Sequence, residues 1–354
     1  MPTVRLSGTV AGSQDPNRTL RAQLLHDLFD AGWDINNSNG KEKITLNNIE
    51  QKIINSDAFV FTPGASLEDL FKAISVFVGY QTLDKHLAAK PTVILNNDDS
   101  WDYIFNLLTH LNKLGTVKQD YRDYLLTAEN SDEVAEILEA FLEKKKGLPP
   151  IDREPLPEPQ GVPIDANTPA PDDLLGNVCV FCSASIEKEG YINDGIALGR
   201  QLAENKLGCV SGAGKTGIMG AVVKGSVDAK GWTAGSNVPH IIELEGLPTG
   251  LSCFWLRDDI YTRMEVMIEN SDAFVIFPGG AGTIQELLAL LIFQQQDHEL
   301  MRGKPIIIFN RLDSNGDRFW EPLVDLLPKF CSSNDYLIVD ELDEIIPAIK
   351  AKLK

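Results

Sequence analysis

The residues best suited to chemistry lie between positions 278 and 286. They read Pro-Gly-Gly-Ala-Gly-Thr-Ile-Gln-Glu and directly follow the apolar run Ala273–Phe277. A strand, a glycine turn and a helix start in this order expose backbone N–H groups that lack partners inside the helix, and a phosphate supplies the missing acceptors. Glu286 follows one helical turn later, so its carboxylate would lie near the same phosphate. The candidate phosphate donors are the N–H groups of Gly279, Gly280, Gly282 and Thr283.

A second glycine loop, Ser211–Thr216, reads Ser-Gly-Ala-Gly-Lys-Thr. It ends like an ATPase phosphate loop, but Cys209 stands where that motif requires its first glycine. The loop at 278–286 also departs from the dinucleotide-binding pattern, because Gln285 stands at the third glycine position. One such loop could be a plain strand-to-helix turn without a ligand. Two of them, after two strands of one domain, favour a binding site.

Arg263 lies in the helical segment that precedes the central apolar run. A guanidinium fixed near a phosphate loop binds phosphate or ribose oxygens through two parallel hydrogen bonds. The alternative for a lone arginine is a solvated surface position. The spacing between Arg263 and the loop at 278–286 favours a role in the site.

These residues must be positioned by strands and helices. In the second half of the chain, short Val/Ile/Leu/Phe runs alternate with amphipathic segments, which predicts an α/β fold with a Rossmann-like, doubly wound parallel sheet. The predicted strands are Val178–Cys182, Leu207–Ser211, His240–Leu244, Ala273–Phe277, Ile306–Phe309 and Leu337–Val339. The predicted helices are Asn193–Glu204, Ile218–Ala229, Asp259–Glu269, Thr283–Gln296, Phe319–Phe330 and Glu344–Leu353.

Ligands of such sheets bind beyond the carboxyl ends of the strands, at the point where strand order reverses. Both glycine loops and the turn at 183–185 fall at such ends. The further candidate nucleotide contacts at this edge are Ser183, Ser185, Gly212, Gly214, Gly217 and Met219. Phe254 and Trp255 lie in a predicted loop, Leu247–Leu256, where they would stack on a base or pack in the core.

Composition narrows the classes of partner. The net charge of −19 argues against a nucleic-acid or anionic-membrane surface. The longest apolar stretch, Leu287–Phe293, is too short to span a membrane. Five cysteines without framework spacing indicate reduced thiols, and with no signal-peptide pattern we expect a cytoplasmic protein. The pair Cys179 and Cys182 resembles one half of a four-ligand zinc site, but a buried strand explains the pair better. We expect no metal and no cofactor.

The two halves of the chain repeat each other. Asn55–Phe61 matches Asn270–Ile276, and Lys90–Asn96 matches Lys304–Asn310. A proline-rich segment separates the halves and behaves as an extended spacer. The sequence therefore predicts a duplicated fold in two related domains, residues 1–145 and 177–354, joined by a linker at 146–176.

Taken in order, the loop at 211–220, Arg263 and the loop at 278–286 resemble the LOG (LONELY GUY) family of nucleoside 5'-monophosphate phosphoribohydrolases, often mislabelled lysine decarboxylases. The resemblance covers roughly residues 177–354, and a similar glycine loop occurs in the two-domain nucleotide 5'-monophosphate nucleosidases of bacteria. One departure is Met264, which stands where the family usually has lysine after the arginine. The decarboxylase label gains no support, since no pattern for a pyridoxal phosphate lysine flanks these motifs.

The resemblance implies hydrolysis of the N-glycosidic bond of a nucleoside monophosphate, giving free base and ribose 5-phosphate. Arg263 and Glu286 match the family's catalytic arginine and glutamate, while Gly280, Gly282 and Thr283 would anchor the phosphate. The alternative is a non-catalytic nucleotide sensor or carrier with the same pocket. The resemblance also implies a homodimer or larger homo-oligomer, with Leu287–Phe293 and Gln294–His298 as candidate interface segments.

The first half has lost these features. Asn48 aligns with Arg263, and the loop Pro63–Asp69 is two residues shorter than its counterpart, without the second and third glycines or the threonine. Asp69 aligns with Glu286, but a shorter side chain on a shorter loop would not reach the same point. We predict a catalytically silent copy in which Glu68 and Asp69 form either a vestige of the site or, preferably, a plain acidic helix start.

Overall fold

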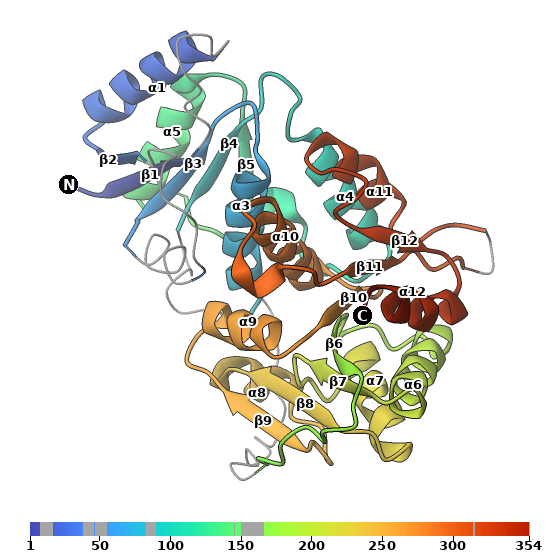
Figure 1. Cartoon of the computed structure of the whole chain (residues 1–354). Helices are drawn as coiled ribbons and strands as arrows, with labels where there is room; N and C mark the ends of the chain where they lie inside the picture. Colours follow the sequence, from blue (N-terminus) through green and yellow to red (C-terminus); the bar gives the residue numbers. More distant parts are fainter. Residues whose placement is uncertain are drawn as a thin grey trace. The chain divides into compact units, whose positions relative to one another are not determined.

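The computed structural model describes residues 1–7, 17–37, 46, 55–82, 90–144, 146–149, 166–313 and 316–353. The chain divides into two compact units, Met1–Asp152 and Arg153–Lys354, and each is described by itself (Figure 1). Among the residues described, no helix is both long and apolar enough to cross a bilayer.

The first unit contains a five-stranded parallel sheet in the order β2-β1-β3-β4-β5. Its strands are β1 (Thr3–Ser7), β2 (Asp34–Asn37), β3 (Ala58–Phe61), β4 (Thr92–Leu95) and β5 (Leu125–Ala128). Its described helices are α1 (Arg18–Asp30), α3 (Leu67–Gln81), α4 (Asp102–Lys113), the 3-10 turn η1 (Tyr121–Asp123) and α5 (Ser131–Leu142).

The second unit contains a seven-stranded parallel sheet in the order β12-β11-β10-β6-β7-β8-β9. Its strands are β6 (Gly176–Phe181), β7 (Leu207–Ser211), β8 (Thr233–Asn237), β9 (Cys253–Leu256), β10 (Ala273–Ile276), β11 (Ile306–Phe309) and β12 (Leu337–Val339). Its helices are α6 (Glu189–Glu204), α7 (Gly217–Asp228), α8 (Pro239–Glu245), α9 (Ile260–Glu269), α10 (Ala281–Gln295), α11 (Glu321–Leu326) and α12 (Ile345–Lys352), with 3-10 turns at Glu299–Met301, Leu327–Lys329 and Leu342–Glu344. The predicted α/β class and parallel, doubly wound sheet are confirmed.

The duplication is visible in the topology. The order β2-β1-β3-β4-β5 repeats as β7-β6-β10-β11-β12, so the second sheet is the first with β8 and β9 added at one edge. Equivalent hydrogen bonds recur as well. The Trp101 N–H donates to the Asn96 side chain at 3.1 Å, and the Trp320 N–H donates to the Asn310 side chain at 2.7 Å. The two sheets therefore fit a duplication of one unit.

The predicted strand His240–Leu244 is wrong, because these residues form helix α8. Pro239 lies at the first position of this helix. Backbone N–H groups in the first turn make no bond inside the helix, so a proline there loses no hydrogen bond and favours a helix start. Two strands were missed. One is β8, whose small and polar residues resemble a turn although all five are buried, and the other is β9, which includes Phe254 and Trp255 from the predicted loop.

Part of the predicted linker lies against the second sheet. The Thr168 N–H donates to the carbonyl of Ser252 at 2.8 Å, and the Trp232 indole donates to the carbonyl of Thr168 at 2.9 Å. The Leu175 N–H donates to the carbonyl of Lys206 at 2.8 Å. Residues on the carboxyl side of the proline-rich segment are thus bonded to the second unit.

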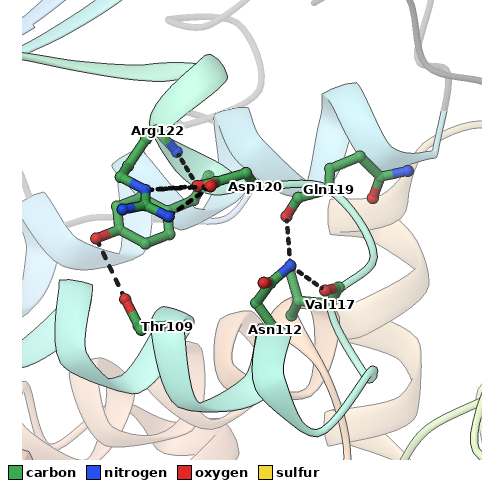
Figure 2. A network of polar contacts seen from close by, with 7 residues as sticks. Thr109, Asn112, Val117, Gln119, Asp120 and Arg122 are labelled. Atoms are coloured by element: carbon green, nitrogen blue, oxygen red, sulfur yellow. Dashed lines mark hydrogen bonds and ion pairs between the residues drawn. The ribbon is translucent and has the colours of Figure 1, made fainter.

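Figure 2 shows the polar contacts that fix the connection between α4 and β5 in the first unit. The Arg122 guanidinium makes a two-point contact with the carboxylate of Asp120, at 2.9 Å and 2.6 Å. The amide of Asn112 donates to the carbonyl of Val117 at 2.9 Å and reaches that of Gln119 at 3.5 Å. These groups satisfy one another and hold the chain reversal, so their role is structural.

Helix α10 is apolar around its whole circumference and buried along most of its length. Every residue of the candidate interface segment Leu287–Phe293 is at most 4% exposed within the chain. A helix of this kind is a core element that fixes its own first turn firmly in place. The homo-oligomer itself stays a prediction.

Candidate active site

The loops after β6 and β10 are joined where the strand order reverses. The Ser183 N–H donates to the carbonyl of Pro278 at 3.1 Å, which ties the two loops together. The Ser183 carbonyl accepts the N–H of Met219 at 3.0 Å, which adds the start of α7. The Ser183 hydroxyl accepts the N–H groups of Ser185 and Ile186 at 3.0 Å and 3.1 Å, and the side chain is buried. Ser183 therefore organises the turn, while Ser185 is exposed at its rim.

The loop after β7 is held in a strained conformation. Ala213 has a φ of 54° and Gly217 a φ of 61°, both in the left-handed region. The Gly214 N–H donates to the sulfur of Met219 at 3.0 Å. A side chain at Gly217 would strike the carbonyl of Ala184, with 2.6 Å between Cβ and oxygen. Gly214, Gly217 and Met219, predicted as ligand contacts, thus also lock the β6 and β7 loops against each other.

Arg263 is buried, with 8% of its surface exposed, and extends from α9 across the ends of two strands. Its Nε donates to the carbonyl of Ser236 at 2.9 Å, and its Nη2 donates to the carbonyl of Gly212 at 3.2 Å. A Cβ at Gly212 would lie 2.0 Å from that Nη2, so only glycine admits the guanidinium. Arg263 therefore contacts the β7 loop directly, while its predicted role beside the loop at 278–286 stays a prediction.

Glu286 is 7% exposed and lies in the second turn of α10. Burial raises the pKa of its carboxyl to about 7; the Arg263 guanidinium opposes this rise, and the Glu245 carboxylate adds to it. A carboxyl with this pKa is present in both charge states near neutral pH, as proton transfer requires. Arg263 and Glu286 are therefore electrostatically coupled in one buried corner.

The first turn of α10 has features that suit an anion. Gly280 is the N-cap residue with extended backbone angles, and no side chain of the described residues caps the helix. A Cβ at Gly279 would lie 2.1 Å from the Thr283 hydroxyl, so glycine lets that buried hydroxyl reach the loop. No described atom lies within 4 Å of a Cβ built on Gly282, so its outer face is open. A glycine helix start without a side-chain cap favours a phosphate.

Sequence reasoning missed Glu245, the last residue of α8. Its Oε2 lies 2.9 Å from the position that a Cβ on Gly214 would occupy, so this carboxylate overlies the β7 loop. Its charge also raises the pKa of the buried Cys182 thiol at the end of β6, after burial and Glu286. The signal that would have found it was the proline-initiated helix α8, which the sequence analysis took for a strand.

The two aromatic candidates both lie in strand β9. Phe254 packs against a small buried cluster of Ala213, Ile242 and Leu247, so it supports the β7 loop from the β9 side. Trp255 is half-buried in the edge strand β9. Met264, which stands where the LOG family usually has lysine, is 1% exposed and is a core residue.

In the first unit, the equivalent groups bond to one another. Asp69 accepts hydrogen bonds from the Ser7 hydroxyl at 2.8 Å and from the Ser66 N–H at 3.0 Å, and Ser66 caps α3 in return. The Gly64 N–H is bonded to the side chains of Asp98 and Ser100. The helix start that stays uncapped in α10 is thus closed in α3. Asn48, which aligns with Arg263, lies outside the described residues, as do residues 38–40 in the segment that corresponds to the β7 loop.

Comparison with known proteins finds relatives in one enzyme family. The family model described as "Possible lysine decarboxylase" matches residues 219–351. Cytokinin riboside 5'-monophosphate phosphoribohydrolase LOG4 of Arabidopsis thaliana is 30% identical over 176 residues, which is 47% of this chain and 76% of that protein. The cytokinin riboside 5'-monophosphate phosphoribohydrolase of Rhodococcoides fascians is 28% identical over 155 residues, 43% of this chain and 73% of that protein.

Among solved structures, the Moco carrier protein of Chlamydomonas reinhardtii is 17% identical, with a TM-score of 0.36 over 50% of this chain and 96% of that one. That likeness is too weak to bear on function. The sequence relatives are stronger, and the family model spans Arg263, Glu286 and the loop at 278–286. The chain belongs to the LOG family, whose named members are phosphoribohydrolases.

Proposed function

We propose that the second unit hydrolyses the N-glycosidic bond of a nucleoside 5'-monophosphate. Water adds its hydroxyl group to the anomeric carbon, the bond to the base breaks, and the base leaves with a proton, giving ribose 5-phosphate. The observation that carries the proposal is the pairing of a buried, proton-exchanging Glu286 with a buried Arg263 beside an uncapped glycine helix start.

The phosphate would bind at the first turn of α10. Gly282 and Thr283 offer N–H groups there, and the open face of Gly282 leaves room for phosphate oxygens. Binding at this remote group would hold the ribose in place, and fixed geometry of this kind lowers the barrier of the reacting step. Arg263, anchored on two strand ends, would meet the oxygens of the same nucleotide.

Glu286 would act in its ionised form. Cleavage of a glycosidic bond passes through a sugar that resembles an oxocarbenium cation, which a nearby carboxylate stabilises. The same carboxylate would accept a proton from the attacking water, a contribution typically worth ~10²–10⁴-fold. A pKa of about 7 suits this role, because the group is basic enough to take the proton and still ionised at neutral pH.

The proposal is tested by incubating the purified protein with a panel of purine and pyrimidine monophosphates and measuring free base and ribose 5-phosphate. We expect turnover with at least one nucleotide, lost in Glu286→Gln while nucleotide binding by calorimetry persists. Glu299→Gln, an exposed carboxylate just beyond α10, is the matched control. Binding without turnover in the wild-type protein would instead support a nucleotide sensor or carrier. The absence of both nucleotide binding and turnover would reject both functions.

The first unit would take no part in the chemistry. Its helix start is closed by Ser66 and Asp69, and its glycine N–H is already bonded to Asp98 and Ser100. A phosphate would have to displace side chains that are bonded internally. The predicted silent copy therefore remains our interpretation of residues 1–145.

A further inference from the structure

The end of the linker pairs with the edge of the second sheet. Strand β9 is the last strand in the sheet order, so one of its edges faces no other strand of the seven (Figure 1). The Phe254 N–H donates to the carbonyl of Ala166 at 2.9 Å, and the Thr168 N–H donates to the carbonyl of Ser252 at 2.8 Å. Such bonds satisfy backbone groups that an exposed edge would leave unpaired. Residues 166–168, which we call the linker strand, therefore extend the sheet in the antiparallel direction.

The linker strand is also held by a buried tryptophan. The Trp232 indole donates to the carbonyl of Thr168 at 2.9 Å, and the Trp232 carbonyl accepts the N–H of Cys209 in β7 at 3.0 Å. A Cβ at Gly208 would lie 2.9 Å from the indole ring, so glycine makes room for the tryptophan. The linker strand is thus bonded to the edge of the sheet and, through Trp232, to a strand further inside it.

Contacts continue from β9 to the arginine of the candidate site. The Ser236 hydroxyl, in β8, donates to the carbonyl of Trp255 in β9 at 2.7 Å. The carbonyl of the same serine accepts the Nε–H of Arg263 at 2.9 Å, and Ser236 is fully buried. A shift of β9 would therefore move an oxygen that orients the guanidinium.

Strand β9 supports the second bond of Arg263 as well. Phe254 packs against the buried cluster that contains Ala213. Ala213 has a φ of 54° and follows Gly212, whose carbonyl accepts the Nη2 of Arg263 at 3.2 Å. An alanine in the left-handed region is strained, so the packing around it must hold that conformation. Both carbonyls that orient the guanidinium therefore depend on contacts made by β9.

We propose that the linker strand is a positioning element of the candidate active site, which acts through β9 on Arg263. The inference rests on the function proposed above. Strand β9 has four residues, and a short segment with few hydrogen bonds opens locally at little cost in free energy. The two bonds from the linker strand oppose such opening. Displacement of a reacting group by about 1 Å lowers a rate by up to ~10²-fold, so a firmly held β9 supports the chemistry.

Proline substitutions at neighbouring positions test the linker strand. Thr168→Pro removes the N–H that bonds to Ser252, because proline has no backbone donor. Asn167 lies opposite Cys253, at a position whose own N–H takes no part in the pairing. Asn167→Pro therefore introduces the same ring but keeps both bonds, and Thr168→Val keeps them too. We expect kcat for the most active monophosphate to fall roughly 5-fold to 30-fold in Thr168→Pro and to stay within about 2-fold in the two controls.

A double substitution separates the positioning of Arg263 from a general loss of structure. If the linker strand acts through Arg263, Thr168→Pro should cost nothing further once Arg263→Ala has removed the guanidinium. A structural defect elsewhere would lower kcat by the same factor with and without Arg263, and that result would overturn the inference. An unchanged kcat in Thr168→Pro alone would overturn it as well.

Hydrogen exchange at the Nε–H of Arg263, followed by nitrogen-15 NMR of the arginine side chains, separates this inference from the proposed function. Arg263→Ala identifies the resonance by its disappearance. Faster exchange in Thr168→Pro than in Asn167→Pro supports the positioning role even if no nucleotide is hydrolysed, in which case only the proposed function fails. Equal exchange rates in the two variants overturn the role of the linker strand whatever the activity.

Discussion

The Nε of Arg263 donates a 2.9 Å hydrogen bond to the carbonyl oxygen of Ser236, near the end of β8. This bond ties a helix that leads into β10 to a strand three positions away in the sheet. Together with the Nη2 bond to Gly212, it gives the guanidinium one orientation. A charge held in this way stabilises a developing anion or a phosphate without reorganising during the reaction.

Activity of the wild-type protein should rise with pH through the pKa of Glu286, about 7. The ionised carboxylate is the form proposed to accept the proton, and its population grows as pH increases through that value. The measurement is kcat/KM for the most active monophosphate across neutral pH. If kcat/KM instead fell as pH rose through this range, Glu286 would act in its protonated form.

Glu286→Gln should stabilise the protein at alkaline pH. The folded carboxyl keeps its proton up to about pH 7, whereas the unfolded one loses it near its ordinary value of 4.5. Unfolding therefore becomes easier as pH rises through this window, and the penalty persists above it. The gain in unfolding free energy for the variant should be near zero at pH 4 and reach at most about 3 kcal/mol above pH 7. Chemical denaturation at both pH values measures it, and an equal gain at both would contradict the assigned burial.

Arg263→Ala should lower kcat by roughly 10²–10³-fold, the usual cost of removing a fixed electrostatic group from a reaction centre. It should also move the acidic limb to higher pH, since Arg263 lowers the pKa of Glu286. Arg263→Lys keeps the charge but cannot reach both carbonyls. We therefore expect the acidic limb of kcat/KM against pH to return close to its wild-type position, while kcat stays low. If Arg263→Lys restored kcat as fully as it restored the position of the acidic limb, the positive charge alone would account for the role of Arg263.

Gly282→Ala separates folding from ligand binding. The added methyl group meets no described atom within 4 Å, so stability should stay the same or rise by about 0.5–1 kcal/mol. The methyl group would lie where phosphate oxygens approach, and KM should increase roughly 10-fold to 100-fold. Thermal unfolding and initial rates measure the two effects. An unchanged KM would place the phosphate elsewhere.

Asp69→Asn should weaken the first unit and leave the chemistry intact. Asp69 is 3% exposed and accepts bonds from Ser7 and Ser66, so the change disrupts a buried network worth roughly 1–3 kcal/mol. Turnover measured below the unfolding temperature should match that of the wild-type protein. Loss of kcat without loss of stability would show that the first unit contributes to catalysis.

Much of the fold and the core of the site could be predicted from residue patterns. Buried parallel strands such as β7 and β10 are mostly apolar runs, and the glycine loops mark their carboxyl ends. The burial of Arg263 and Glu286 follows from their places beside these loops. The bonds that join the loops through Ser183 and Met219 could not be predicted, because such contacts arise only in the folded chain.

The wrong strand and the two missed strands of the second unit all lie between β7 and α9. A short apolar run such as His240–Leu244 has no periodicity that separates a strand from a helix. β8 reads Thr-Ala-Gly-Ser-Asn, which local preference assigns to a turn, and only pairing with β7 and β9 makes it a strand. Glu245 was not predicted as a site residue, because its position depends on where α8 ends.

The closed helix start of α3 bears on how this duplicated gene can change. The carboxylate of Asp69 now serves folding, through Ser66 and Ser7, so freeing it for a ligand would first cost the domain its cap. Regaining the two missing loop residues alone would insert them into a region whose donors are already bonded to Asp98 and Ser100. For the silent copy that we propose, each step back toward a ligand site would therefore cost folding stability before it restored a ligand contact, so the loss would be hard to reverse.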